Sequence, residues 1–127
     1  MLTREQIRVA NDRPREWVPT PDWTPEGETY DPKIHGVWVG ILSGKQKDEA
    51  EILLFSRKTP NEEKNAANVR GVMVARSAQN EDGSRMFADA DADWLGDKSA
   101  RPLTDIANAA FRLNRMRAQD QDELTKN

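Results

Sequence analysis

The acidic run Asp89–Asp93 alternates aspartate with alanine, a spacing that suggests a calcium-binding loop. An EF-hand calcium loop also needs a glycine at its sixth position and a bidentate carboxylate at its twelfth. Here those positions hold Trp94 and Ala100. If the run is helical, its carboxylates also point around the helix axis and do not converge on one ion. We therefore predict the acidic start of a short helix with Trp94 and Leu95 as buried anchors, and no bound metal or cofactor.

The only histidine, His35, stands at the end of a loop rich in proline and glycine. A histidine general base needs a positioning partner and a nucleophile within hydrogen-bond reach. The sequence has no G-x-S-x-G, P-loop or dinucleotide-binding motif from which such chemistry would start. We therefore predict that His35 is a solvent-exposed spacer and that the protein is not an enzyme.

A basic cluster, Arg112, Arg115 and Arg117, lies near the end of the last predicted helix, where cations complement the helix dipole. Three acidic residues follow within six positions, and the net charge of the whole chain is −3. Trp17 and Trp38 lie on predicted strands that lack the interleaved Arg and Lys of an aromatic RNA-binding platform. The sequence therefore favours no nucleic-acid partner, with a DNA-binding regulator as the weakest of three functional readings.

The composition of the chain is unusually polar for its size. It has 127 residues, enough for one domain, of which 36% are hydrophobic and 32% charged. Such a chain either contains mobile segments or buries apolar surface against partners. The absence of cysteine fits a reducing cytosol, and the apolar runs are too short to span a membrane.

The N-terminal third predicts one short helix and a β-ribbon. Thr3 and Gln6 form a capping-box pattern at the start of a helix whose buried side is expected to hold Leu2, Ile7 and Ala10. Trp17-Val18 and residues 37–42 have strand composition and are expected to pair. We expect the tryptophans at positions 17 and 38 to pack this ribbon onto helices. The loop 24–36 is expected to be a mobile insertion, and Trp23 beside it to be free to make contacts.

The rest of the chain predicts helices. One runs from the cap Ser43 to about Lys58, and a central, most buried one runs from the cap Asn61 to about Arg76. Its interior Gly71 suggests a close helix crossing. The acidic helix (88–95) and a last helix from Ser99 follow. The predicted fold is mainly α with a small antiparallel β-ribbon (α+β), one compact domain of about five helices over residues 1–117, and a polar tail, 118–127, expected to be mobile.

Several phrases of the sequence occur in an order that resembles the tail assembly chaperones of long-tailed, siphovirus-type bacteriophages. They run from the N-terminus to the last helix: Met1–Ile7, Val72–Arg76, Glu81–Phe87, Trp94–Gly96, Lys98–Ala100 and Phe111–Asn114. The resemblance covers most of the chain and is strongest over residues 72–114. The loop 24–36 departs from it, because the family pattern there is a short Trp-Gly turn between strands.

The resemblance implies a non-enzymatic function in the host bacterial cytoplasm. Proteins of this family bind the tape-measure protein, help to recruit tail-tube subunits and are absent from the mature virion. A chaperone of this kind needs exposed apolar surface that covers a client or self-associates weakly into a homo-oligomer. The alternative function is a minor virion structural protein, such as a head–tail connector or minor tail protein.

One helix offers such a surface. Residues 52–55 are four adjacent apolar residues that span more than half the circumference of the helix, so one core face cannot bury all of them. We therefore predict a partner-binding surface that includes Ile52, Phe55, Met116 and Leu124.

Overall fold

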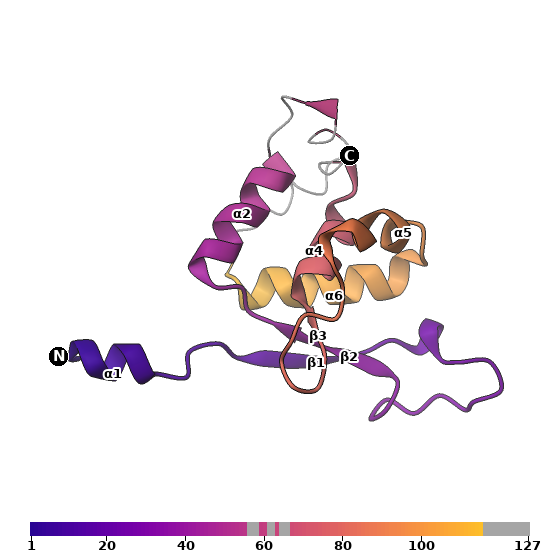
Figure 1. Cartoon of the computed structure of the whole chain (residues 1–127). Helices are drawn as coiled ribbons and strands as arrows, with labels where there is room; N and C mark the ends of the chain where they lie inside the picture. The colour runs from indigo at the N-terminus through magenta and orange to yellow at the C-terminus, as the bar shows by residue number, and fades with distance from the viewer. Residues whose placement is uncertain (56–58, 61–62, 64–66, 116–127) are drawn as a thin grey trace.

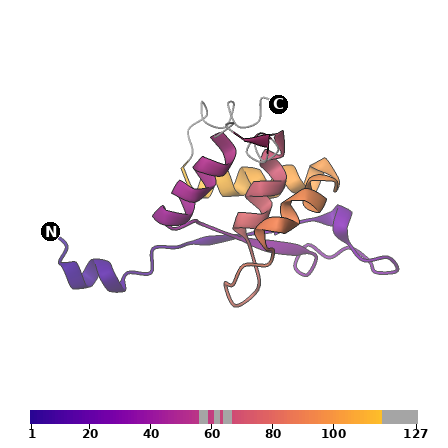
Figure 2. The same cartoon turned by 45° about the horizontal axis from the view of Figure 1, so that its top comes forward.

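The computed structural model describes residues 1–55, 59–60, 63 and 67–115 of the chain. Within them, five α-helices and a three-stranded antiparallel sheet form a mainly helical α+β fold, as the sequence predicts. The helices α2 (Gly44–Phe55), α4 (Val69–Ser77), α5 (Ala92–Gly96) and α6 (Ala100–Leu113) lie together on one face of the sheet. Figures 1 and 2 show this helical layer above the strands from two directions. The polar tail 118–127 lies outside the described residues.

The sheet has the order β1-β2-β3. The predicted ribbon is confirmed: β1 (Arg15–Pro19) pairs with β2 (Gly36–Gly40), with Trp17 opposite Trp38. A third strand, β3 (Ala78–Gln79), pairs with the other edge of β2 and was not predicted. It has only two residues, too few for an alternating pattern to be visible in the sequence.

The two faces of the sheet differ in a way that corrects the expected role of Trp17 and Trp38. Val18, Val37 and Val39 are buried and face the helices. Since neighbouring residues of a strand point to opposite faces, both tryptophans lie on the other face. There their rings make an edge contact with centroids 5.4 Å apart. They pack against each other and not, as predicted, onto helices.

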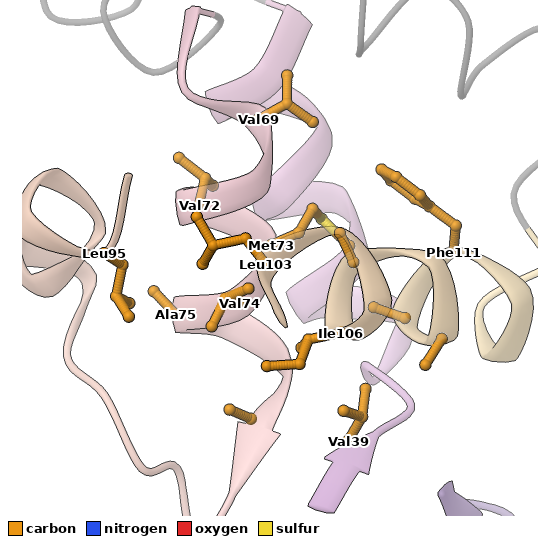
Figure 3. Packing of buried hydrophobic residues seen from close by; sticks show 14 of the residues in the cluster. Val39, Val69, Val72, Met73, Val74, Ala75, Leu95, Leu103, Ile106 and Phe111 are labelled. Carbon is orange, nitrogen blue, oxygen red and sulfur yellow. The ribbon is translucent and has the colours of Figure 1, made fainter. Parts of the chain in front are cut away.

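Helix α4 is the centre of the core, as its run of apolar residues predicts. Val72, Met73, Val74 and Ala75 are all buried. In Figure 3 they lie between Leu95 of α5 and the α6 residues Leu103 and Ile106. A helix that is apolar on nearly all sides must be covered on nearly all sides, and here the sheet, α5 and α6 cover it.

The start of α4 differs from the prediction. The helix begins at Val69, with Asn68 as its N-cap, and the predicted cap Asn61 lies outside the described residues. The Asn68 side chain accepts from the Gly71 amide (3.3 Å) and donates to the Ala92 carbonyl of α5 (2.7 Å). A Cβ at Gly71 would lie 2.6 Å from that carbonyl oxygen, so the predicted close crossing is confirmed.

Helix α1 (Arg4–Val9) has the predicted capping box but not the predicted burial. The Thr3 amide donates to Gln6 Oε1 (2.9 Å), and the Gln6 amide donates to Thr3 Oγ1 (3.2 Å). No residue of the helix is buried, and residues 1–15 are all exposed. Figure 1 shows α1 projecting from the end of the sheet, away from the helical layer. The expected buried side of Leu2, Ile7 and Ala10 is therefore wrong, because no element of the described part of the chain covers it.

The loop 24–36 follows a short 3₁₀ helix, η1 (Pro21–Trp23), and His35 holds its end together. The His35 side chain is only 9% exposed. Its Nδ1 accepts from the Asp31 amide (2.9 Å), and its Nε2 lies 3.1 Å from the Glu28 carboxylate. The prediction of a solvent-exposed spacer is therefore wrong. A proline- and glycine-rich sequence does not show that an imidazole folds back on its own loop.

Candidate interaction surfaces

The partner surface predicted from the sequence is only partly placed by the structure. Ile52 lies on α2 and is 64% exposed, whereas Leu54 on the same helix is buried. Phe55 is the last residue of α2, but its side chain lies outside the described part of the structure, as do Met116 and Leu124. Whether these four residues form one surface stays a prediction.

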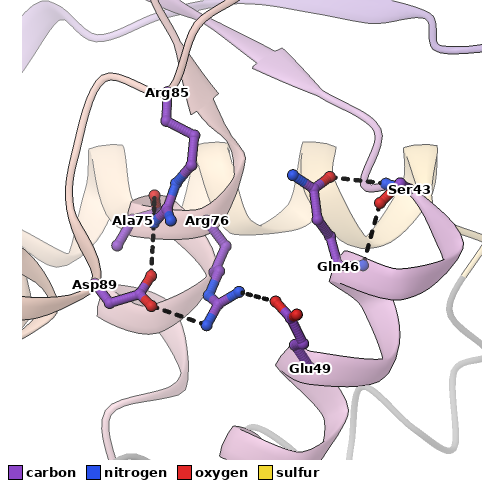
Figure 4. Close-up of polar contacts among 7 residues, drawn as sticks. All are labelled: Ser43, Gln46, Glu49, Ala75, Arg76, Arg85 and Asp89. Carbon is purple, nitrogen blue, oxygen red and sulfur yellow. Dashed lines mark hydrogen bonds and ion pairs between the residues drawn. The ribbon is translucent and has the colours of Figure 1, made fainter.

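An ion-pair bridge fixes the orientation of α2, and with it the position of Ile52. Arg76 of α4 reaches Glu49 of α2 (3.1 Å) and Asp89 (3.0 Å) in opposite directions, as Figure 4 shows. The N-terminus of α2 is closed by a reciprocal cap, in which the Ser43 amide donates to Gln46 and the Gln46 amide donates to Ser43. Together with the buried Ala50 and Leu54, these contacts turn Ile52 outward.

A second group of exposed apolar residues lies on α1 and just before it. Leu2, Ile7 and Val9 are each more than half exposed, and we call residues 1–9 the N-terminal arm. Arg4 and Arg8 both pair with Glu5, at 3.1 and 3.0 Å. The arm therefore carries apolar side chains next to an excess of positive charge.

A third apolar surface is a cleft of about 380 Å³ lined by Trp23, Thr24, Phe87, Trp94, Leu95 and Lys98, which we call the aromatic cleft. The Phe87 and Trp94 rings meet edge to face with centroids 5.7 Å apart. Trp94 is 46% exposed, whereas its neighbour Leu95 is buried. The prediction that both would be buried anchors is therefore right for Leu95 and wrong for Trp94.

Hydrogen bonds fix the orientation of Trp94. Its Nε1 donates to Asp91 Oδ1 (2.9 Å), and the other oxygen of this carboxylate accepts from the Ala88 amide (2.8 Å). Both hydrogen bonds stabilise the charged form of the Asp91 carboxyl and so lower its pKa. The bond from the Trp94 indole has the larger effect, followed by the bond from the Ala88 amide. An ionised Asp91 therefore holds one aromatic wall of the cleft at neutral pH.

The acidic run 89–93 is used for internal contacts. It forms a 3₁₀ turn, η2 (Asp89–Asp91), followed directly by α5. Asp89 binds Arg85 (2.7 Å) as well as Arg76, and Asp91 binds Trp94. Among the described residues, no three His, Asp or Glu side chains are grouped so that they could hold a metal ion.

The aromatic cleft was not predicted, although one of its residues was singled out. Trp23 was expected to be free in a loop, but it is half-buried against the core, and its Nε1 has no hydrogen-bond partner among the described residues. The cleft combines residues from two parts of the chain about 65 positions apart, so no local pattern could reveal it. The one available signal was the pair Phe87 and Trp94, aromatic residues on either side of a polar helix start.

Comparisons with protein-family models, with curated proteins and with solved structures give no match to this chain. Within the described residues, no helix has the length and apolar character that crossing a membrane requires.

Proposed function

We propose that this protein is a tail assembly chaperone of a long-tailed bacteriophage, which acts without catalysis in the host bacterial cytoplasm. In this function it binds the tape-measure protein, helps to recruit tail-tube subunits and leaves before the virion is complete. The ordered sequence phrases that resemble this family are the basis for naming these partners.

The exposed apolar side chains of α1 and α2 are the structural observation that supports the proposal. Ile52, Ile7 and Val9 lie in solvent although the chain has a well-packed core for its other aliphatic residues. Exposed apolar residues that are distributed over helices suit transient contact with amphipathic client helices, which bury an apolar stripe on binding.

A minor virion structural protein is the alternative, since such a protein also uses apolar surface for assembly. Mass spectrometry of purified particles separates the two functions. The chaperone is expected to be absent from mature particles but present in infected cells. Its presence in particles in a fixed ratio to tail proteins would show that the alternative is correct.

Client binding is tested by co-expressing the chain with the tape-measure protein of the same phage. Ile52→Lys is expected to lower the soluble fraction of the tape-measure protein severalfold, because it places a charge in the proposed apolar contact. The helix itself should tolerate the lysine, since Asp48 lies four residues before it and can pair with it.

Ile34→Lys is the matched control, because Ile34 is also an exposed isoleucine, 67% exposed, but lies in the loop 24–36. It should solubilise the client as the unmodified chain does. Equal activity of both variants would remove Ile52 from the binding surface. Failure of the unmodified chain to solubilise any tape-measure segment would contradict the chaperone function.

A further inference from the structure

The aromatic cleft is a concave site whose walls come from two distant parts of the chain. It combines Trp23 and Thr24 with residues of the segment 87–98, namely Phe87, Trp94, Leu95 and Lys98. Its volume of about 380 Å³ lies in the range of small-molecule pockets, which are lined mainly by aromatic and apolar side chains with a few polar groups. Leu95 is buried and Trp94 is 46% exposed. The cleft therefore reaches from the edge of the core to solvent and can surround a compact apolar group.

Contacts just outside the cleft hold its two parts together. Asp22 of η1 accepts hydrogen bonds from Ser99 Oγ (3.0 Å) and from Arg101 Nε (2.8 Å) at the start of α6. These bonds join η1 to the segment that follows α5, across 77 positions of the sequence. The aromatic wall on α5 is fixed separately, by the hydrogen bond from Trp94 to Asp91 (2.9 Å). The walls are thus ordered before a ligand enters, so little conformational freedom remains to be lost on binding.

Lys98 gives the cleft its electrostatic preference. It is the one charged side chain among the described residues that line the cleft. Within the described part of the chain, its ammonium group makes no ion pair or hydrogen bond, whereas the nearby Arg101 pairs with Asp22 (2.8 Å). The carboxylates of Asp93 and Asp97 line a separate hollow. The cleft therefore presents one free cation beside apolar walls and favours an anionic ligand.

The other polar side chains of the cleft limit how many polar groups a ligand can carry. The Thr24 hydroxyl donates to the Pro21 carbonyl (2.8 Å), and the Trp94 indole donates to Asp91. Trp23 Nε1 has no partner among the described residues, but it is buried away from solvent and so is not presented to a ligand. Polar groups that enter an apolar site without a partner oppose binding. One anionic group on an apolar body therefore matches this cleft best.

We propose that the aromatic cleft binds a small molecule of one chemical class, an aromatic ring system that carries a single carboxylate. The ring system packs against Trp94 and Phe87, since aromatic rings favour edge-to-face and offset contacts. The carboxylate pairs with Lys98 at an exposed position, where both groups keep part of their hydration and the cost of desolvation stays small. This binding belongs to the purified chain alone, so it holds or fails independently of the proposed chaperone function.

The first experiment titrates the isotope-labelled full chain with 2-naphthoate and follows the indole N–H signals of its four tryptophans by NMR. Trp23 and Trp94 line the cleft, whereas Trp17 and Trp38 pack against each other on the other face of the sheet. Only the signals of the two cleft tryptophans should shift. The Kd should be about 1 mM or lower, as expected for a ligand of about 13 non-hydrogen atoms.

Two related probes separate the contribution of the carboxylate from that of the rings. 2-Naphthamide has nearly the same shape without the charge and should bind about two- to fivefold more weakly, because it lacks one exposed ion pair. High salt should reduce this difference, since it screens exposed charges. Acetate carries the charge without the rings and should shift neither cleft signal at the same concentration.

Lys98→Gln tests the cation of the cleft. It should lower the affinity for 2-naphthoate to that for 2-naphthamide and leave the binding of 2-naphthamide unchanged. Lys45→Gln is the matched control, because it makes the same charge change at an exposed lysine on α2, outside the cleft. It should bind both probes as the unmodified chain does. Trp94→Ala should weaken both probes severalfold, as read at Trp23, while its far-UV circular dichroism matches that of the unmodified chain.

Three results would overturn the proposal. The first is a titration in which 2-naphthoate shifts neither cleft tryptophan, or shifts all four indole signals alike. The second is equal affinity for 2-naphthoate and 2-naphthamide, since this would show that the cleft does not select a carboxylate. The third is a Lys98→Gln variant that binds 2-naphthoate as tightly as Lys45→Gln does.

Discussion

Asn114 is a buried polar residue that joins two parts of the chain. Its Oδ1 accepts from the Leu42 amide (3.0 Å), and its Nδ2 donates to the Ala110 carbonyl at the end of α6 (2.8 Å). A buried amide that loses its acceptor costs about 1–3 kcal/mol. The Asn114 side chain therefore links the segment after β2 to the end of the last helix.

Asn114→Ala should lower the free energy of unfolding by about 1–3 kcal/mol, because the Leu42 amide loses its acceptor. Asn114→Asp keeps that acceptor but places a carboxylate oxygen against the Ala110 carbonyl, so it should destabilise as well. Urea unfolding followed by circular dichroism measures both. Stability within about 0.5 kcal/mol of the unmodified chain for both variants would contradict this role.

Protonation of Asp91 in acid should change the environment of Trp94 in the aromatic cleft. Hydrogen bonds from the Trp94 indole and the Ala88 amide lower the pKa of the Asp91 carboxyl in the folded chain. The ionised Asp91 therefore stabilises the fold fully at pH values above the carboxyl pKa of the unfolded chain, about 3.9. That contribution is lost as the pH falls through the lower folded pKa. Trp94 fluorescence should change in this acid range, and Asp91→Asn should remove the change.

At the scale of elements, Gly71 permits the close crossing of α4 and α5. Gly71→Ala improves helix propensity by about 1 kcal/mol, but the new Cβ would lie 2.6 Å from the Ala92 carbonyl oxygen. The steric clash should outweigh the gain in helix propensity, so the free energy of unfolding should fall by about 1–3 kcal/mol.

Gly44→Ala is the control for this substitution. Gly44 is also helical, at the first position of α2, and a Cβ there meets no atom within 4 Å. It should leave stability unchanged or raise it by up to about 1 kcal/mol, because alanine has less conformational freedom to lose on folding. If Gly71→Ala unfolds at the same temperature as Gly44→Ala or at a higher one, the crossing of α4 and α5 tolerates a methyl group.

The elements that could be predicted are those with strong local signals. The capping box at Thr3, the cap at Ser43, the strand pair and the last helix all appear where the sequence places them. The start of α4 was missed because Asn68 caps it while also binding α5, a contact between residues 24 positions apart. Local patterns indicate which segments are helical, but they do not show that a capping residue also binds a distant helix.

At the scale of the whole molecule, the N-terminal arm should make no contribution to the stability of the fold. Deleting residues 1–12 removes only exposed residues, so the unfolding free energy at low concentration should change by less than about 0.5 kcal/mol. Urea unfolding of the truncated and complete chains measures this. A loss of more than about 1 kcal/mol would mean that the arm packs on its own molecule.

The sequence alone determined the α+β class, the pairing of the two strands that hold Trp17 and Trp38, and the central place of α4. These follow from the spacing of apolar residues and from caps, which act over a few positions. Only the tertiary structure decided that α1 is exposed, that the His35 side chain folds back onto its own loop and that Trp23, Phe87 and Trp94 share a cleft. Burial depends on which distant segment lies opposite a side chain, and no local pattern contains that information.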